Sequence, residues 1–543
     1  MKEAARKKGR GCKGNARFAA LVLSEEQRSA LLDAIRGKIA AEHFELIEAM
    51  TQAFPELLGL LEQKGMSISR LRRIAFGAST EKTAALCREG AAAEAVKAPG
   101  KTKRKGHGRR PASSYTGAKR VPVSHPTLKA GDGCPDCQKG KVRTLPEPAP
   151  VIKVRAAPPI TATVYEMEVL RCSLCGKTFT APTPEEAGQE KYEPSVGVMV
   201  ALLRYGNGMP FNRLEGFQET LEIPLPSSNQ WEEAKKTAQP LRPVFECLKW
   251  TAAQARTLFN DDTTMRIGDL RRQIQAEKDP ERTGIFTSSI VAEVEDHHIA
   301  LFFTGRKHAG ERLDELLRLR DTALPPPMQI CDALSRNWPK RAKTLLGSCL
   351  CHGRRPFVEV AESFPQECLR VLKSVRIIYR VESRSKAKGY DAQERLAFHQ
   401  RRSKPVMDKL KRWLEESFEQ KLVEPNSGFG QAFNYLLGHW EKLTLFLREP
   451  GAPLDNNICE RALKMAIRHR KNSLSYKTPR GAEVGDLFMS LIHTCRLNRV
   501  NPHHYLTALV GNASAVEADP ARWLPWNYKE PLAAASPPQA LSA

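Results

Sequence analysis

The chain has 543 residues, 41% of them hydrophobic, which is enough for three or more domains with more than one core. It carries 85 Lys and Arg against 61 Asp and Glu, so its formal net charge is +24. This excess favours a polyanion such as nucleic acid as the partner, over a protein that merely carries basic tails.

No apolar run reaches the roughly 18–20 residues of a membrane span. The brief apolar stretch near the N-terminus is broken by Arg17 and does not fit a signal peptide. Thirteen cysteines, several in C-x-x-C pairs, indicate metal binding in a reducing compartment rather than disulfides. We therefore expect a cytoplasmic, nucleoid-associated protein with no membrane partner.

Residues 1–90 are expected to form a helical arm. A capping-box start at Ser24 precedes apolar residues at helical spacing, and Pro55 separates them from a second amphipathic stretch over residues 56–74. The arm is either a short coiled coil for self-association or a plain two-helix unit.

Residues 91–130 read as a basic linker. Its segment from Lys101 to Arg120 holds eight Lys or Arg and no acid. This composition predicts a flexible tether that binds phosphates, with Arg109 and Arg110 as candidate contacts, or else a solvated spacer.

Residues 131–190 carry two C-x-x-C pairs, in which each pair can present two thiolates from one turn. Four thiolates in two such pairs favour a closed tetrahedral zinc site over unliganded buried cysteines or a redox role. The expected Zn²⁺ ligands are Cys134, Cys137, Cys172 and Cys175. Alternating apolar residues predict strands that link the two pairs, namely Val151, Val154, Tyr165 and Val169.

Residues 191–250 predict three short helices, over residues 196–204, 210–221 and 226–237, with Gly and Pro breakers between them. They fit a helix-turn-helix that places its last helix in a DNA groove, and nearly as well a linking bundle without DNA contact.

The whole chain is expected to be a multidomain α+β protein, in which residues 251–510 form a catalytic α/β domain. Three strands are expected over residues 258–305, then a helix over 310–319, then a short buried strand that ends at Asp332. This order is that of an RNase H-like core. A charge-rich helical insertion is expected at about residues 340–450, and residues 511–543 are expected to be a C-terminal tail.

Three acids in this domain fit phosphodiester chemistry. Asp261 and Asp332 lie on expected strands, and Glu460 lies just inside a helix, on one face with Asn456 and Asn457. Two Mg²⁺ (or Mn²⁺) ions held by such carboxylates can stabilise the attacking and leaving oxygens together. Because acids at strand ends are often merely solvated, three acids alone are a weak signal. Basic residues that follow Glu460 are candidate DNA contacts: Arg461, Lys464, Arg468, Arg470 and Lys471.

Over residues 71–509 the chain resembles the insertion-sequence 66 family of bacterial DDE transposases. The resemblance rests on LRRIAFGASTEK (71–82), HGRRP (107–111), RYGNGMPFNRLE (204–215), SCLCHGRRPF (348–357), ERLAFHQRRSKPVMDKLKRWL (394–414) and PLDNNICERALKMAIRHRKNSL (453–474), the last being the most specific. It implies an RNase H-like domain with a helical insertion, a zinc-binding domain, and DNA cleavage and strand transfer at the terminal inverted repeats of a mobile element. A homo-oligomer on DNA and accessory proteins of the same element are further expectations.

The resemblance also carries residues over. The first acid falls in Asp261-Asp262-Thr263, where the family has DET, and Asp261 is favoured with Asp262 in reserve. The second, Asp332, lacks the Gly and aromatic residue that usually follow, whereas Glu460 lies in an intact DNNxxER motif. Ser473 replaces a Trp of the family and Ser475 an aromatic residue. These changes either tune DNA contact or mark a diverged subgroup.

Two other functions stay open from the sequence, namely a transposase-derived DNA-binding protein without catalysis and an RNase H-like nuclease. Cys349, Cys351 and His352 are either a second metal site or, as we favour, a packed helix start. The terminal repeat sequence, the target preference, the number of subunits and the activity of this copy are not given by the sequence.

Overall fold

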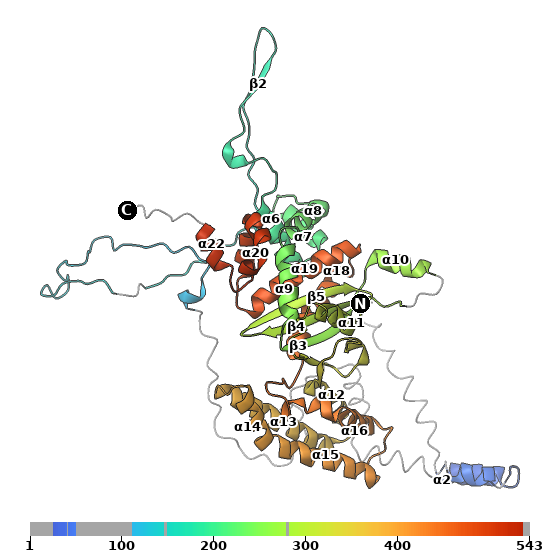
Figure 1. Cartoon of the computed structure of the whole chain (residues 1–543). Coiled ribbons are helices and arrows are strands. Elements are labelled where there is room, and N and C mark those ends of the chain that lie inside the picture. The colour runs from blue at the N-terminus through green and yellow to red at the C-terminus, as the bar shows by residue number, and fades with distance from the viewer. Residues whose placement is uncertain are drawn as a thin grey trace, which may run out of the picture. The chain divides into compact units, whose positions relative to one another are not determined.

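The computed structural model describes residues 25–40, 42–49, 51, 111–145, 149–277 and 282–535 (Figure 1). Helices and a five-stranded mixed sheet make the protein α+β, as expected. Its elements fall into two compact units, one formed by Ala93–Gln239 and the other by Met1–Ala92 and Pro240–Ala543. None of the helices within the described ranges is long and apolar enough to cross a membrane.

In the smaller unit, three helices follow one another as predicted. Gly197 allows the first and third helices to approach closely, because a Cβ at this position would fall 1.9 Å from Thr237 Oγ1. A helix-turn-helix function for these helices stays a prediction. The helices are α6 (Pro194–Ala201), which continues into the π-helical turn Leu202–Gly206, α7 (Phe211–Thr220) and α8 (Ser227–Ala238).

The strands expected between the two cysteine pairs are largely wrong. Only Val169 lies in a strand, within the short hairpin of β1 (Val169–Arg171) and β2 (Thr178–Thr180). Val151, Val154 and Tyr165 are exposed and lie outside strands, and alternation marks a strand only where one face is covered.

The five-stranded sheet belongs to the larger unit and has the order β5-β4-β3-β6-β7. The first three strands along the chain pair antiparallel, and β6 and β7 then run parallel to β3 on its other side. The strands are β3 (Thr257–Thr264), β4 (Phe286–Val294), β5 (His297–Gly305), β6 (Met328–Cys331) and β7 (Leu345–Ser348).

The predicted strands and the helix α11 (Ala309–Leu317) are thus present, with two differences. The first strand ends at Thr264 rather than Gly268, because helix α10 (Gly268–Ala276) begins there. The short strand β7 was not predicted and lies within the range expected for the insertion.

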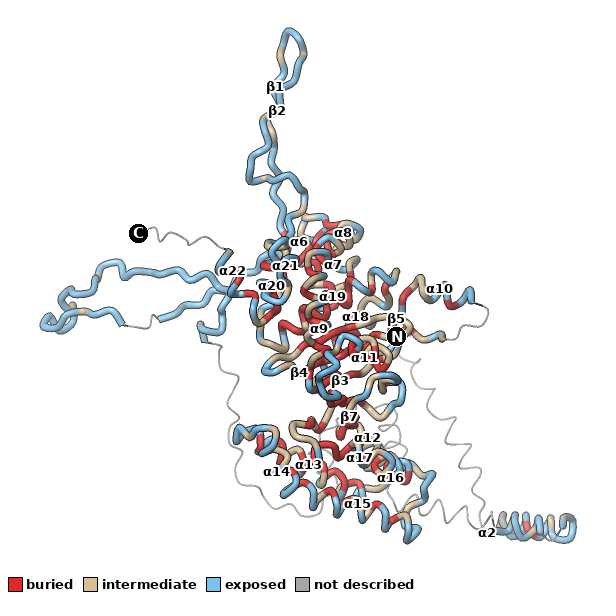
Figure 2. Tube along the Cα trace, in the orientation of Figure 1, coloured by how far each residue is buried: buried red, intermediate tan, exposed pale blue. Residues whose placement is uncertain are grey.

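Helix α19 (Pro479–Leu497) covers the outer edge of the sheet, along β5. Backbone N–H groups of β5 donate to side chains at four-residue spacing: His298 to Asn498 (3.0 Å), Ala300 to Thr494 (3.0 Å), Phe302 to Ser490 (2.9 Å) and Thr304 to Asp486 (2.6 Å). An edge strand otherwise offers unpaired groups to other chains. Polar residues inside an otherwise buried helix therefore close the sheet, as the buried trace of α19 shows (Figure 2).

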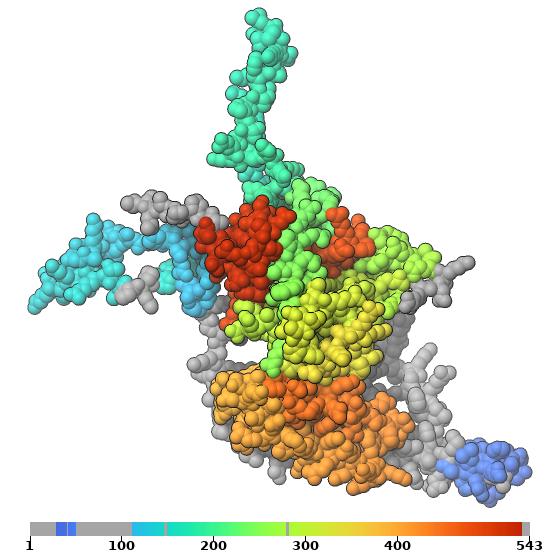
Figure 3. All heavy atoms as spheres, viewed as in Figure 1, coloured from blue at the N-terminus to red at the C-terminus, as the bar shows by residue number. Residues whose placement is uncertain are grey.

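The insertion between β7 and Asp455 is helical, as expected, and has its own aromatic core. Phe433 lies at its centre, with ring centroids 4.5 Å from Phe429 and 5.1 Å from Trp413. Figure 3 shows this region in orange. Its helices are α12 (Leu350–Glu359), α13 (Pro365–Ala387), α14 (Ala392–Arg402), α15 (Lys404–Glu419), α16 (Gly428–Gly438) and α17 (Trp440–Leu443).

The two ends of the chain differ from each other. In the N-terminal arm, α2 (Glu25–Ile35) and residues 42–49 are helical, whereas the stretch over 56–74 and the linker up to residue 110, with Arg109 and Arg110, lie outside the described residues. The expected tail is packed: Trp523 is buried, and its carbonyl accepts the Tyr505 hydroxyl at 2.8 Å. Its elements are α20 (Pro502–Gly511), α21 (Ala513–Ala518), the 3₁₀ turn Pro520–Trp523 and α22 (Lys529–Ala535).

Burial raises the pKa of Asp486 to about 7, which makes the edge closure depend on pH. Between the unfolded value near 4 and about 7, the folded chain holds a proton that the unfolded chain releases, so this group's contribution to stability falls as pH rises. We predict that Asp486→Asn gains stability relative to the wild type between pH 5 and pH 8, by up to a few kcal/mol because one pKa unit is about 1.4 kcal/mol. Urea unfolding at both pH values measures this, and Ser490→Ala, on the same helix face, should show a loss independent of pH. Equal effects of Asp486→Asn at both pH values would contradict the prediction.

Candidate active site

Asp261 and Asp332 lie on neighbouring parallel strands. The parallel register pairs Leu258 with Gln329 and Phe259 with Ile330. Asp261 lies two positions after Phe259, and Asp332 lies two positions after Ile330, so the two acids occupy equivalent positions. Neighbouring parallel strands lie about 4.8 Å apart, and side chains at equivalent positions point to the same face. The register therefore brings the two carboxylates together.

The environment of Asp261 is unfavourable for a negative charge. Its pKa rises to about 7, first because the carboxyl is buried and then because of the negative charge of Asp332, with a smaller contribution from Glu460. The backbone N–H of Asp262, at 2.8 Å from Asp261 Oδ1, acts in the opposite direction. A cation bound beside these carboxylates would relieve this repulsion.

Asp262, the reserve choice, is engaged elsewhere. Its carboxylate lies 2.8 Å from His308 Nδ1, at the N-cap of α11, and 3.3 Å from an Arg336 guanidinium nitrogen. Successive side chains of a strand point to opposite faces, so Asp262 points away from the face of Asp261. The geometry thus favours Asp261 as the first acid.

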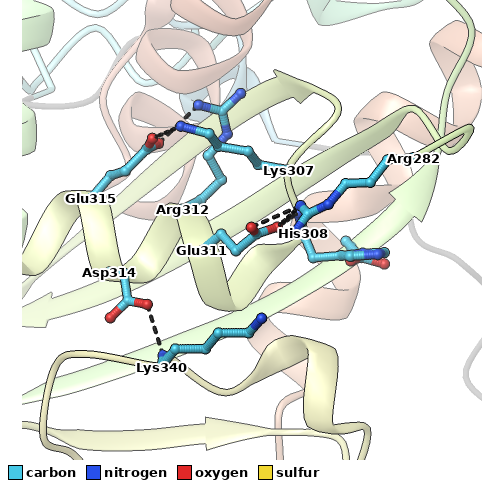
Figure 4. Close-up of polar contacts among 9 residues, drawn as sticks. Arg282, Lys307, His308, Glu311, Arg312, Asp314, Glu315 and Lys340 are labelled. Atoms are coloured by element: carbon cyan, nitrogen blue, oxygen red, sulfur yellow. Dashed lines mark hydrogen bonds and ion pairs between the residues drawn. The ribbon is translucent and has the colours of Figure 1, made fainter. Parts of the chain in front are cut away.

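Asp332 is held by the loop that follows β6. Its Oδ1 accepts hydrogen bonds from the Asn337 side chain at 2.6 Å and from the Leu334 backbone at 3.1 Å. Asp314 of α11 fixes the next part of this loop by accepting the backbone N–H of Lys340 at 2.7 Å (Figure 4). It also accepts those of Arg341 and Ala342, at 3.0 and 2.9 Å.

Glu460 lies in the first turn of α18 (Asn457–Ser473), which packs on β3 and β4. Asn456 is the N-cap and not part of the helix, so the three residues do not all lie on one helix face as expected. Instead Asn456 is fully buried, and its side-chain amide donates to the Asn260 carbonyl of β3 at 3.1 Å. Asp455 accepts the Tyr379 hydroxyl of the insertion at 2.8 Å. The DNN residues therefore attach the start of α18 to the sheet and to the insertion.

The insertion contributes two residues that the sequence did not mark as neighbours of the acids. Burial and, next, the negative charge of Asp332 together raise the pKa of Tyr435 to about 12, so this phenol lies near the second acid. The Lys442 ammonium lies 3.7 Å from the centroid of the Trp338 ring, next to the loop that holds Asp332. Neither residue belongs to a recognisable short motif.

The basic residues of α18 form two groups. Arg461, Lys464, Arg468 and Lys471 are exposed along one side of the helix. Arg470 points inward, where its guanidinium donates to Thr263 Oγ1 at 3.1 Å and to Thr264. Arg470 therefore fastens α18 to the end of β3 and is a poorer candidate for a DNA contact than the other four.

The two cysteine pairs have the same local geometry. The backbone carbonyls of Cys134 and Cys172 each accept the backbone N–H of the residue four positions later, which is Gln138 or Gly176. Both of these later residues have positive φ. Backbone hydrogen bonds lower the pKa of Cys137 and of Cys172. The structure does not bring the two pairs into one cluster: the set of three or more ligand-type side chains found within the described residues is Cys349, His352 and Glu460.

Comparison with known proteins places the chain in a family. The model of the family described as Transposase IS66 family matches residues 190–484 of the 543, a range that includes the sheet, the three acids and the insertion. The uncharacterized protein y4hP of Sinorhizobium fredii is 25% identical over 395 residues, which cover 68% of each chain. The uncharacterized protein y4jD of the same organism is 31% identical over 188 residues, 34% of this chain and 36% of that one. The family match spans more than half of the chain, which therefore belongs to the IS66 transposase family.

Proposed function

We propose that this protein is a DDE transposase that cleaves and joins DNA strands at the ends of its mobile element. The observation that carries the proposal is the parallel register of β3 and β6, which sets Asp261 beside Asp332 under the helix that bears Glu460. Three antiparallel strands followed by two parallel ones on the far side of the first is the strand order of an RNase H-like core, which supports the same assignment.

Asp261, Asp332 and Glu460 are the residues that would hold divalent metal. Carboxylate oxygens are the ligands that Mg²⁺ and Mn²⁺ prefer, and the mutual repulsion at Asp261 fits a site that is completed by cations. When bound, a pair of such ions stabilises the attacking and leaving oxygens of phosphodiester cleavage. The chain itself orients the acids through Asn337 and Asn456.

DNA is the proposed partner, both as terminal inverted repeats and as target. The exposed side of α18 starts next to Glu460, so Arg461 and Lys464 can hold the phosphate backbone close to the acids. A homo-oligomer on DNA and accessory proteins of the element are part of the same proposal.

Zinc in the smaller unit is a separate proposal. The repeated turn at Cys134 and at Cys172, with backbone N–H groups that favour thiolates, fits the donor set of a structural Zn²⁺ site. Closing one four-thiolate site requires the two turns to meet.

We predict that Asp261→Asn, Asp332→Asn and Glu460→Gln each abolish DNA cleavage with Mg²⁺ and leave DNA binding nearly unchanged. Each change removes an anionic oxygen and no basic residue. Asp262→Asn is the matched control, and it should keep measurable cleavage because Asp262 points to the other face. Cleavage of terminal-repeat DNA and gel-shift binding measure the two effects. Full cleavage by one of the three variants would remove that residue from the triad, and binding without cleavage by the wild type would favour a non-catalytic DNA-binding protein.

We predict one zinc ion held by Cys134, Cys137, Cys172 and Cys175. Structural zinc contributes on the order of 10 kcal/mol to the folding of a small module. Cys172→Ser should therefore release the ion, unfold this segment locally and weaken binding to the element ends. Elemental analysis and limited proteolysis test this, and full zinc retention by Cys172→Ser would refute the ligand set.

We predict that the two basic regions act differently. Neutralising Arg461 and Lys464 should lower turnover more than binding, because these residues lie within one or two turns of Glu460. Neutralising four charges within Lys101–Arg120 should instead flatten the plot of log K against log salt, by up to about 0.9 per lost phosphate contact, with turnover at saturating DNA little changed. A salt slope that the linker changes leave unaltered would mean that the linker is only a spacer.

A further inference from the structure

A cluster of three different ligand types adjoins the proposed DDE acids. Cys349, His352 and Glu460 each place one ligand atom within 4.8 Å of the other two. Cys349 is the N-cap of α12 and His352 lies in its first turn, and their ligand atoms lie close together there. Glu460 reaches the same point from the first turn of α18.

Two atoms of this cluster lack the partners that buried polar atoms normally have. His352 Nδ1 and Glu460 Oε1 are both buried and face each other at 3.5 Å, and neither has a hydrogen-bond partner within the described part of the chain. A buried polar atom without a hydrogen-bond partner calls for an explanation, and an ion held between the two atoms is one. Two ligands about 2.0–2.1 Å from a tetrahedral ion lie roughly 3.4 Å apart, which agrees with the observed separation.

The third ligand atom is prepared in a similar way. Cys349 Sγ is fully buried and accepts the backbone N–H of Asn456 at 3.3 Å, a contact that a metal-bound thiolate can keep. The neighbouring Cys351 thiol contacts that of Cys349 and has two further partners: its Sγ lies 2.9 Å from the Tyr379 hydroxyl and 3.5 Å from the Asn457 amide nitrogen. Cys351 is not part of the cluster of three ligand atoms, so it serves as the comparison for Cys349.

We propose that Cys349, His352 and Glu460 form a second metal site for a late first-row divalent ion such as Zn²⁺, next to the oxygen site of Asp261 and Asp332. Thiolate and imidazole ligands favour such ions over Mg²⁺. Three protein ligands leave the fourth position of a tetrahedral ion open, which is the pattern of catalytic and not of structural zinc. Because Glu460 belongs to both sets, the site deepens the proposed function, on which its role in catalysis rests.

Co²⁺ is a suitable probe, because a thiolate ligand gives it a near-ultraviolet charge-transfer band. Four full-length proteins are titrated with Co²⁺ in the absence of DNA. They are the wild type, Cys349→Ser, His352→Gln and the control Cys351→Ser. The two C-x-x-C pairs of the smaller unit are the same in all four proteins, so their contribution cancels in the difference spectra. We expect the wild type and Cys351→Ser to bind one Co²⁺ more than Cys349→Ser, with the matching charge-transfer intensity.

His352→Gln should weaken this ion by at least about tenfold, which is the lower end of the loss when even an outer partner of a ligand is removed. If circular dichroism shows that Cys349→Ser does not fold, the titration of His352→Gln alone tests the metal site. Titrations of Cys349→Ser and His352→Gln that match the wild type would overturn the site. If the wild type binds this Co²⁺ ion but does not cleave DNA, the metal site is supported and the proposed function is contradicted. If the wild type cleaves DNA with Mg²⁺ but does not bind this Co²⁺ ion, the proposed function is supported and the metal site is contradicted.

Discussion

The parallel pairing of β3 with β6 is the constraint on which the candidate active site depends. It fixes Asp261 and Asp332 at equivalent positions, so the two like charges are held together whatever else binds. Burial and, next, the negative charge of Asp332 raise the pKa of Asp261 to about 7, so part of this shift is the cost of the arrangement. A fold keeps such repulsion only where surrounding contacts determine the backbone, and here hydrogen bonds from Asn337 and the attachment of its loop to Asp314 do so.

Two helices complete the sheet in different ways. Helix α19 satisfies the edge of β5 with Asp486, Ser490, Thr494 and Asn498, so the side of the sheet away from the acids ends in packed protein. Helix α18 instead brings a carboxylate to the sheet, and Asn456 fixes its starting point. The insertion joins the same place through Tyr379, which donates to Asp455. Strand register, helix start and inserted domain therefore meet at Glu460.

The sequence predicted the parts of this fold that have strong local signals. Alternation and β-branched runs predicted the strands from β3 to β6, and the DNNxxER motif predicted the helix that bears Glu460. The inward contact of Arg470 depends on tertiary packing, and no periodicity separates it from Arg468. The polar residues of α19 did carry a signal, because their four-residue spacing in an apolar helix is unusual. The catalytic roles of the acids and the zinc ligands stay predictions.

On the proposal of a second metal site, the active site joins two kinds of ligand through one residue. Asp261 and Asp332 offer only oxygen, which suits Mg²⁺, whereas Cys349 and His352 add sulfur and nitrogen, which suit later metals. A cation bound at either site would cancel part of the negative charge around Asp261, while the two cations would repel each other and share Glu460. A mixed site of this kind would discriminate between metals by ligand type, with Glu460 as the residue through which the two ions are coupled.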